Sequence, residues 1–231
     1  MEIERKFLVK DDSWRKQAGE PTYIAQSYFP EATAGKVYLW LDESGEKPQL
    51  NIRKWNGKSF VVDVPQEELD KLGAEGKREM FDDKGSFTVD DTHTGRVRFK
   101  GENRALITLK ADTGDAAIRH ELEFDICPET ARSINETGCT EKGIEKYRYE
   151  LPSGTEHPWE VDVFDGANKG LVLAELEMPD AEMPFAKPQW LGDEVTYDRR
   201  FTNRALAEHP YSQWDMTDKL AIQQSGAGQA R

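Results

Sequence analysis

Cysteine, histidine and long apolar runs are scarce in this chain of 231 residues. It has two cysteines, Cys127 and Cys139, no Cys-x-x-Cys motif, and four histidines. These counts argue against a disulfide framework and against a thiolate zinc site. No apolar run approaches the length that spans a bilayer, and no signal peptide follows Met1. The sequence therefore predicts a cytoplasmic protein that does not associate with membranes.

Basic residues are also in deficit. The chain has 31 Lys and Arg residues against 44 Asp and Glu residues, which gives a net charge of −13. This balance disfavours a general nucleic-acid-binding surface and attraction to anionic membranes. An anionic ligand would therefore need a local basic pocket. The apolar content of 37% still predicts a globular protein, and the length suits one large domain or one domain with an insertion.

Apolar and polar residues alternate along much of the chain, which predicts antiparallel strands and a mainly β fold of the α+β class. Flanking helices are expected after Asp11, where Asp12 or Ser13 would cap the first turn, over residues 128–137, and near residues 203–207. Eight strands are expected at residues 1–9, 23–29, 96–101, 104–110, 118–126, 144–151, 159–164 and 171–178.

Residues 31–94 carry structural signals of their own. Strands are expected at 36–41, 49–55 and 59–64, and a helix at 66–79. This segment is too structured to be a plain loop. We therefore expect an inserted β-rich subdomain at about 31–94 within a domain of residues 1–207, followed by a C-terminal tail at 208–231.

The amino terminus carries two acids and a base at alternate positions. On a strand, Glu2, Glu4 and Lys6 would share one face, while Ile3 and Phe7 would share the other. Two carboxylates and an ammonium can hold a hard divalent cation together with the anion that the cation carries. A solvated strand face would explain the same pattern, so the rest of the chain has to decide between the two interpretations.

Later strands repeat this arrangement and separate the charges by sign. Like charges side by side on a strand repel one another, so their recurrence suggests that each pair has an external counter-ion, a metal cation for acids and a polyanion for bases. The basic pairs are Arg96 with Arg98 and Lys146 with Arg148, and the acidic pairs are Glu121 with Glu123, Glu160 with Asp162, and Glu175 with Glu177.

If eight such strands closed into a barrel with the charges inside, the lumen would be a polar tunnel for a small ligand. Because buried charges need partners, a linear polyphosphate with divalent metals would satisfy both signs. In order and spacing, the segments Glu2-x-Glu4-x-Lys6, Arg96-x-Arg98, Leu106-Ile107-Thr108-Leu109-Lys110, Arg119-x-Glu121-x-Glu123, Lys146-x-Arg148, Trp159-Glu160-Val161-Asp162-Val163-Phe164 and Glu175-x-Glu177 resemble the CYTH, or triphosphate tunnel metalloenzyme, superfamily.

The resemblance implies a closed eight-stranded antiparallel β-barrel that binds a triphosphate with Mg²⁺ or Mn²⁺, as two ions. It implies hydrolysis of inorganic tripolyphosphate to pyrophosphate and phosphate by in-line attack of water. The insertion would cap a tunnel mouth, alter the preferred substrate length or form a dimer surface. The implied phosphate-binding residues are Lys6, Arg96, Arg98, Lys110, Arg119, Lys146 and Arg148, and the implied metal ligands are Glu2, Glu4, Glu121, Glu123, Asp162, Glu175 and Glu177.

Catalytic roles in this scheme fall to Lys6, Glu123 and Tyr28. Members of the superfamily often carry Gln-Gly-Tyr-Leu where this chain has Gln26-Ser27-Tyr28-Phe29. A tyrosine there could position or deprotonate water, or could simply pack in its strand. Other functions stay open: a class IV adenylate cyclase or a thiamine triphosphatase on the same scaffold, and a polyphosphate-binding module without enzymatic activity.

Overall fold

The computed structural model describes residues 3–55, 57–112, 119–179, 184–219 and 222, and the side chains of Ile3, Ala34, Asp112 and Arg119 are not part of that description. The fold is mainly β, with antiparallel sheets and a few helices. The chain divides into two compact units, one formed by residues 1–25 and 144–231 and the other by residues 26–143. No helix in the described part of the chain is both long and apolar enough to cross a membrane.

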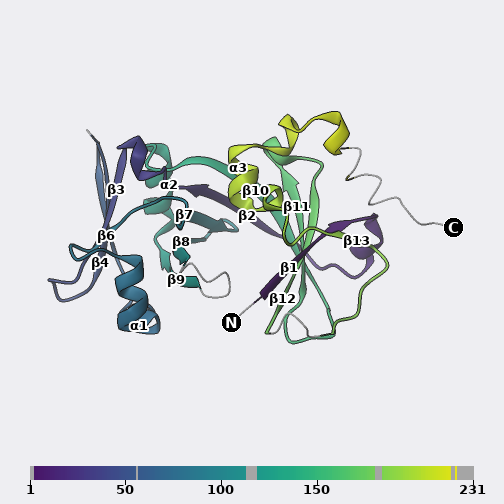
Figure 1. Ribbon diagram of the computed structural model, residues 1–231, viewed down its shortest axis with the longest axis horizontal. Coiled ribbons are helices and arrows are strands. Elements are labelled where there is room, and N and C mark those ends of the chain that lie inside the picture. The colour runs from purple at the N-terminus through teal and green to yellow at the C-terminus, as the bar shows by residue number, and fades with distance from the viewer. Residues whose placement is uncertain (1–2, 56, 113–118, 180–183, 220–221, 223–231) are drawn as a thin grey trace. The chain divides into compact units, whose positions relative to one another are not determined.

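The first unit contains a twisted antiparallel sheet with the strand order β13-β1-β12-β11-β10, whose strands are labelled in Figure 1. Phe7 of the first strand lies opposite Ala174, and Arg148 lies opposite Asp162. The strands are β1 (Ile3–Val9), β10 (Glu141–Leu151), β11 (Trp159–Asp165), β12 (Val172–Met178) and β13 (Leu191–Glu194).

One face of this sheet builds a core rich in tryptophan. Phe7 and Trp190 each pack against Trp159 in a T-shaped, edge-to-face arrangement, with ring centroids 5.7 Å apart in both pairs. Trp14 and Leu176 are also fully buried in this cluster. Because side chains alternate along a strand, burying these positions leaves the alternate positions of the same strands, which are the charged ones, on the opposite face.

The second unit combines the strands β7-β8-β9, which belong to the same nine-stranded sheet as the strands above, with a four-stranded sheet of the order β5-β4-β3-β6. The former are β7 (His93–Lys100), β8 (Arg104–Asp112) and β9 (Arg119–Ile126). The four-stranded sheet contains β3 (Val37–Asp42), β4 (Gln49–Lys54), β5 (Ser59–Asp63) and β6 (Ser86–Phe87). In Figure 1, β3, β4 and β6 stand beside the helix α1 (Gln66–Met80).

Both sheets of the second unit share one hydrophobic core. Leu50 and Ile52 of β4 belong to the same buried cluster as Leu69 of α1, Ile107 of β8 and Leu122 of β9. The helix α2 (Pro128–Glu136) adds Ala131 and Ile134 to that cluster. The segment around residues 31–94 is therefore packed into the backs of β7–β9 rather than built around a separate core.

Shorter elements complete the fold. Asp11 caps the first 3₁₀ helix by accepting a hydrogen bond from the Ser13 amide, so the predicted helix starts there but takes its cap one or two residues earlier. Strand β2 (Thr22–Tyr28) continues from one unit into the other, as β10 does, and α3 spans Asn203–Glu208. The 3₁₀ helices are η1 (Asp12–Lys16), η2 (Ala32–Ala34), η3 (Gly166–Asn168), η4 (Arg199–Phe201) and η5 (Tyr211–Gln213).

The predicted strands and helices have described counterparts within a few residues, whereas β6 and β13 were not predicted. The predicted closed barrel is not observed. Among the described strands, β13 pairs with β1 and β9 pairs with β8, and neither has a partner on its other side. Closure requires every strand to have two neighbours, so the described sheets are open. The division of the chain into a 1–207 domain, an insertion and a tail stays a prediction.

Candidate functional site

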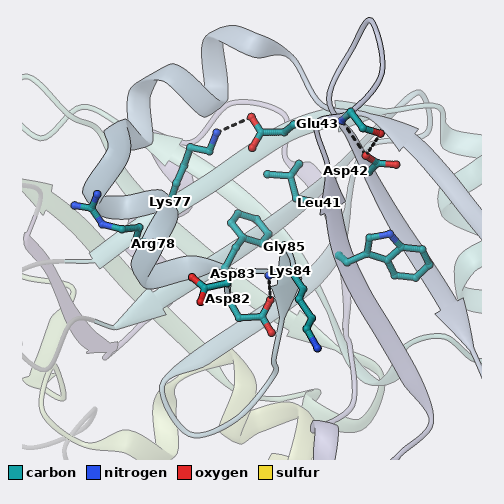
Figure 2. Close-up of a pocket in the computed structure, with 12 residues that line it drawn as sticks. Leu41, Asp42, Glu43, Lys77, Arg78, Asp82, Asp83, Lys84 and Gly85 are labelled. Atoms are coloured by element: carbon teal, nitrogen blue, oxygen red, sulfur yellow. Dashed lines mark hydrogen bonds and ion pairs between the residues drawn. The ribbon is translucent and has the colours of Figure 1, made fainter.

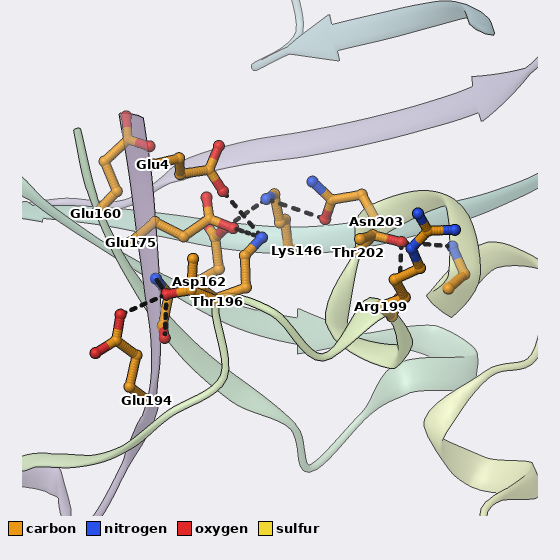
Figure 3. Close-up of polar contacts among 12 residues, drawn as sticks. Glu4, Lys146, Glu160, Asp162, Glu175, Glu194, Thr196, Arg199, Thr202 and Asn203 are labelled. Carbon is orange, nitrogen blue, oxygen red and sulfur yellow. Dashed lines mark hydrogen bonds and ion pairs between the residues drawn. The ribbon is translucent and has the colours of Figure 1, made fainter. Parts of the chain in front are cut away.

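Charged side chains occupy the face of the first unit's sheet opposite the tryptophan core. They come from alternate positions on adjacent strands, with Lys6 opposite Glu175 and Glu160 also opposite Glu175. Figure 3 shows Glu4, Glu160 and Glu175 near one another, with Lys146 beside them. We call this group the acid-rich cluster; its members are Glu4, Lys6, Lys146, Arg148, Glu160, Asp162 and Glu175.

Lys6 joins two carboxylates of this cluster. Its Nζ lies 2.6 Å from Glu175 Oε1 and 2.9 Å from Glu4 Oε1. Burial lowers the pKa of Lys6, but the charges of Glu175 and Glu4 outweigh burial and raise it well above its usual value. Burial alone would raise the pKa of Glu175, yet Lys6, Lys146 and Arg148 hold it well below its usual range. Lys6 therefore remains a cation and Glu175 a carboxylate.

Arg148 contacts three of the four carboxylates of the cluster. Its Nε donates to Asp162 Oδ1 at 2.7 Å, and one terminal nitrogen donates to Asp162 Oδ2 at 2.6 Å and to Glu175 Oε2 at 2.7 Å. The other terminal nitrogen pairs with Glu160. Asp162 also pairs with Lys146, a buried lysine whose pKa is lowered by burial against the pull of Asp162. Cross-strand ion pairs thus supply the counter-charges that the sequence pattern suggested would come from a ligand.

The cluster nevertheless keeps an excess of acid, with four carboxylates, Glu4, Glu160, Asp162 and Glu175, against three cations. Burial raises the pKa of Glu160, and Asp162, Glu175 and the nearby Glu177 raise it further against the effect of Arg148. Crowded carboxylates of this kind attract a cation.

Glu175 lies buried among the cations of the cluster. Its Oε1 lies 2.6 Å from the Lys6 ammonium, and its Oε2 accepts from Arg148 at 2.7 Å. Carboxylate oxygens are the ligands that Mg²⁺ and Mn²⁺ prefer, so this donor set fits a hard divalent cation. No group of three or more acidic, His or Cys side chains in the described part of the chain is already arranged around a metal position, so binding would require side chains to leave their present ion pairs.

The second unit carries a charged face on which basic side chains outnumber acidic ones, here called the base-rich face. On β7, Arg96 and Arg98 alternate with the buried Val97, and on β8, Thr108 and Lys110 alternate with the buried Leu109. Lys110 Nζ lies 2.6 Å from Glu121 Oε2. The face consists of the cations Arg96, Arg98, Lys100, Arg104 and Lys110 and the acids Glu121, Glu123 and Asp125. Excess positive charge on a rigid sheet suits phosphate oxygens.

Glu123 is held on this face as a carboxylate. Burial would raise its pKa, but the hydrogen bond from Thr108 and the charges of Arg98 and Arg96 lower it below its usual value. Arg96 lies 3.8 Å from the same carboxylate. Glu123 can therefore accept a proton or orient a water molecule without first losing a proton of its own.

Tyr28 is half-buried at the end of β2 and hydrogen-bonds to Gln26, whose amide nitrogen donates to the phenol oxygen at 2.6 Å. Burial raises the pKa of Tyr28, although Arg96 and Arg98 oppose the rise. A phenol with a raised pKa keeps its proton, so its oxygen accepts from Gln26 while its hydrogen remains available to donate. The arrangement favours an orienting role over that of a base.

Substitution of Tyr28 by phenylalanine tests that role. Because the hydroxyl orients rather than removes a proton, we expect the Tyr28→Phe variant to lose about tenfold or less in turnover, measured as phosphate release at saturating tripolyphosphate. A loss of several hundredfold would point instead to a base, and unchanged turnover would exclude a catalytic role for the hydroxyl. Tyr147→Phe, on an exposed ring of β10, is the matched control.

Two predicted residues cannot be placed, because Glu2 and the side chain of Arg119 lie outside the description. Sequence reasoning also left three residues out of the predicted site. Glu160 was visible as half of an acidic pair, and its contact with Arg148 brings it in. Asn203 of α3 lies 3.5 Å from Lys146, and Thr108 binds both Arg96 and Glu123. Neither of these neutral residues gave a signal in the charge pattern.

A cavity of about 800 Å³ lies in the second unit, away from every predicted site residue. Figure 2 shows that Lys77 reaches Glu43 across it and that Asp42 bonds within its own loop. Asp82 is likewise satisfied by the amides of Lys84 and Ser86. Because these charged groups already have ionic or hydrogen-bond partners within the second unit, we assign the chemistry to the charged strand faces rather than to this cavity.

Comparison with known proteins identifies the family. The chain is 38% identical over 210 residues to an inorganic triphosphatase of Acetivibrio thermocellus, which covers 91% of this chain and 95% of that relative. It is 35% identical over 124 residues to an inorganic triphosphatase of Nitrosomonas europaea, covering 52% of this chain and 78% of the relative. No protein-family model matches the chain.

Among solved structures, a crystal structure of an inorganic triphosphatase aligns with 90% of this chain and 94% of its own, at 24% identity and a TM-score of 0.49. The family assignment rests on the sequence relatives and not on this structural similarity. The charged β-strands and these relatives define a protein of the CYTH superfamily. Within it, the chain belongs to the inorganic triphosphatase family.

Proposed function

We propose that this protein hydrolyses inorganic tripolyphosphate to pyrophosphate and phosphate. The observation that carries the proposal is the similarity to an inorganic triphosphatase over 95% of that relative's length. The two charged faces support it, because a highly charged anion with a divalent counter-ion needs both bases and acids. A polyphosphate-binding protein without activity would need the bases alone.

The base-rich face and the lysines of the acid-rich cluster would bind phosphate oxygens. Arginine forks bind such oxygens in a bidentate way and lysines bind them as point charges. Lys6 and Lys146 are already held by carboxylates, so binding of phosphate there is an exchange of one anionic partner for another. The residues proposed to bind substrate are Lys6, Arg96, Arg98, Lys110, Arg119, Lys146 and Arg148.

The family implies divalent metal use, and we propose Mg²⁺ or Mn²⁺, as two ions. When bound, such ions neutralise phosphate charge and lower the pKa of a bound water molecule. The ligands are drawn from the acidic residues, with Glu160 added to the set that the sequence indicated. The candidates are Glu2, Glu4, Glu121, Glu123, Glu160, Asp162, Glu175 and Glu177.

The chain itself would position the reactants and balance charge, which is most of what phosphoryl transfer requires. A water oxygen forms a bond to the terminal phosphorus while the bridging bond breaks, and the bridging electrons leave with pyrophosphate. Glu123, held as a carboxylate, accepts a hydrogen bond from the attacking water and takes its proton as the new bond forms, and Tyr28 donates a hydrogen bond to the water oxygen. Lys6, held as a cation between Glu4 and Glu175, offsets charge on the phosphate oxygens.

A substrate panel tests the proposal. Tripolyphosphate, ATP, thiamine triphosphate and longer polyphosphate would each be incubated with Mg²⁺ and with Mn²⁺, and phosphate, pyrophosphate and cyclic AMP measured. Fastest release from tripolyphosphate is expected. Preferred cyclisation of ATP, or tight binding of tripolyphosphate without turnover, would contradict the proposal.

Removal of one base on the base-rich face gives a second test. The Lys110→Ala variant is expected to lose about 10²-fold in kcat/KM for tripolyphosphate, because a phosphate contact is lost and Glu121 is left without its ion partner. Lys10→Ala removes the same charge from an exposed position just after β1, and should retain wild-type activity. Equal activity of both variants would remove Lys110 from the site.

A further inference from the structure

Thr108 lies at the centre of the base-rich face, on β8, and is fully buried at 0% exposure. It stands opposite Arg96 on one neighbouring strand and opposite Glu123 on the other. Its side chain points to the charged side of the sheet, because its neighbours Ile107 and Leu109 are buried in the hydrophobic core on the other side.

The Thr108 hydroxyl makes two bonds that use both of its capacities. Arg96 Nε donates to Thr108 Oγ1 at 3.2 Å, and Thr108 Oγ1 donates to Glu123 Oε2 at 2.6 Å. A hydroxyl can donate once and accept at the same time, so it lies between a cation and an anion and is bonded to each. Direct approach of Arg96 to Glu123 stops at 3.8 Å.

Holding the Arg96 guanidinium by its Nε has a specific geometric effect. An arginine can bind two oxygens of an anion through its two terminal nitrogens, and the Nε hydrogen takes no part in that contact. Without the hydroxyl, Arg96 and Glu123 could form a direct ion pair. The terminal nitrogens of Arg96 would then bind the Glu123 carboxylate and would not be available for phosphate. A β-branched apolar residue would fill the same volume but could not prevent this.

We propose that Thr108 is a positioning residue that keeps Arg96 available for phosphate and Glu123 available for water. The proposal rests on the proposed hydrolysis of tripolyphosphate. Thr108 acts only through its two neighbours and touches neither substrate nor water. Its role is therefore distinguishable from packing by a variant that keeps the shape and removes the hydroxyl.

The test compares Thr108→Val, which keeps the shape, with Thr108→Ser, which keeps the hydroxyl. The Thr108→Val variant is expected to lower kcat/KM for tripolyphosphate about tenfold, mainly through a higher KM. The Thr108→Ser variant should stay within about twofold to threefold of wild type, despite the lost methyl group. Thr140→Val is the matched control, because Thr140 is a buried threonine of the same unit whose hydroxyl binds the neutral Asn135.

A double-mutant cycle connects the effect to its neighbour. In an Arg96→Ala background, Thr108→Val should lower kcat/KM by less than about twofold, since the direct ion pair between Arg96 and Glu123 that the hydroxyl prevents can no longer form. Equal losses for Thr108→Val and Thr108→Ser, or an undiminished effect in the Arg96→Ala background, would overturn the proposal in favour of packing. Failure of the wild-type protein to hydrolyse any triphosphate would overturn the proposed function instead, whatever the variants do.

Discussion

Replacement of Arg148 by methionine is expected to lower the hydrolysis of tripolyphosphate by about 10³-fold. Arg148 bonds to Glu160, Asp162 and Glu175, so its removal unbalances the whole acid-rich cluster as well as removing a proposed phosphate contact. The measurement is phosphate release at several tripolyphosphate concentrations, so that kcat and KM are separated.

The same substitution is expected to destabilise the fold, because Asp162 and Glu175 are buried carboxylates that would lose one of their cations. Breaking a buried ion pair by removing one partner costs about 3–5 kcal/mol, and Lys6 and Lys146 remain to compensate in part. Thermal unfolding should be followed with activity, and the assay should be run well below the transition. Arg53→Met, on an exposed position of β4, is the control for loss of an arginine.

An Arg148→Lys variant distinguishes charge from geometry. Lysine keeps the positive charge but cannot span two carboxylates with a planar fork. We expect it to recover most of the lost stability and less of the lost activity. If Arg148→Met kept more than about a tenth of wild-type turnover in a folded protein, Arg148 would not belong to the site that binds tripolyphosphate.

Chelation of divalent cations is expected to reduce hydrolysis to the background rate, and added Mg²⁺ or Mn²⁺ to restore it. The acid-rich cluster has one more carboxylate than cations, and a divalent ion would offset that excess of negative charge. Because the protein's ion pairs hold the acids without metal, we expect the chelated protein to stay folded in circular dichroism.

Loss of one proposed ligand should shift the metal requirement rather than abolish activity. The carboxylate of Glu4 is half exposed and has its ion pair with Lys6, so Glu4→Gln keeps the shape and removes one negative charge. The Mg²⁺ concentration for half-maximal activity should rise about tenfold or more. Glu20→Gln, in the exposed stretch before β2, should leave that concentration unchanged. Hydrolysis that survives thorough chelation would contradict metal use altogether.

The sequence predicts which faces of the strands are charged, because a period of two places every Lys, Arg, Asp and Glu of the site on one side once the strand is recognised. Phe7 and Leu176 identify the buried side, and Lys6 and Glu175 follow on the other. Strand ends within a few residues of the observed ones come from the same pattern. The very short strand β6 and the short β13 were missed, since two or four residues are too few to show alternation.

Register was the part that the sequence could not supply. Whether Lys6 faces Glu175 or Glu177 depends on which residues pair across strands, and pairing is set by turns and packing far from either residue. For that reason the sequence could not show that charged residues also pair with one another across strands, as Asp162 does with Arg148. Thr108 was missed for a related reason, since a neutral residue acquires its role from its neighbours on other strands.

The segment at 31–94 has a counterpart in the relative from Acetivibrio thermocellus, because the 210 aligned residues cover 91% of this chain and leave too few to omit it. The alignment with the relative from Nitrosomonas europaea covers 52% of this chain. The role of the segment at a substrate entrance or a dimer surface stays a prediction.

The hydrophobic core that the two sheets of the second unit share supports the strands that carry the base-rich face. Val97 and Ile107, on the backs of the strands that carry Arg96 and Thr108, are packed in one cluster with Leu50, Ile52 and Leu69 from the segment behind. A substitution in that segment can therefore tilt β7 and β8 and move the guanidinium groups on their front without touching them. Substitutions in the segment that packs on the back of the sheet can therefore change the substrate preference, although their side chains do not contact a phosphate.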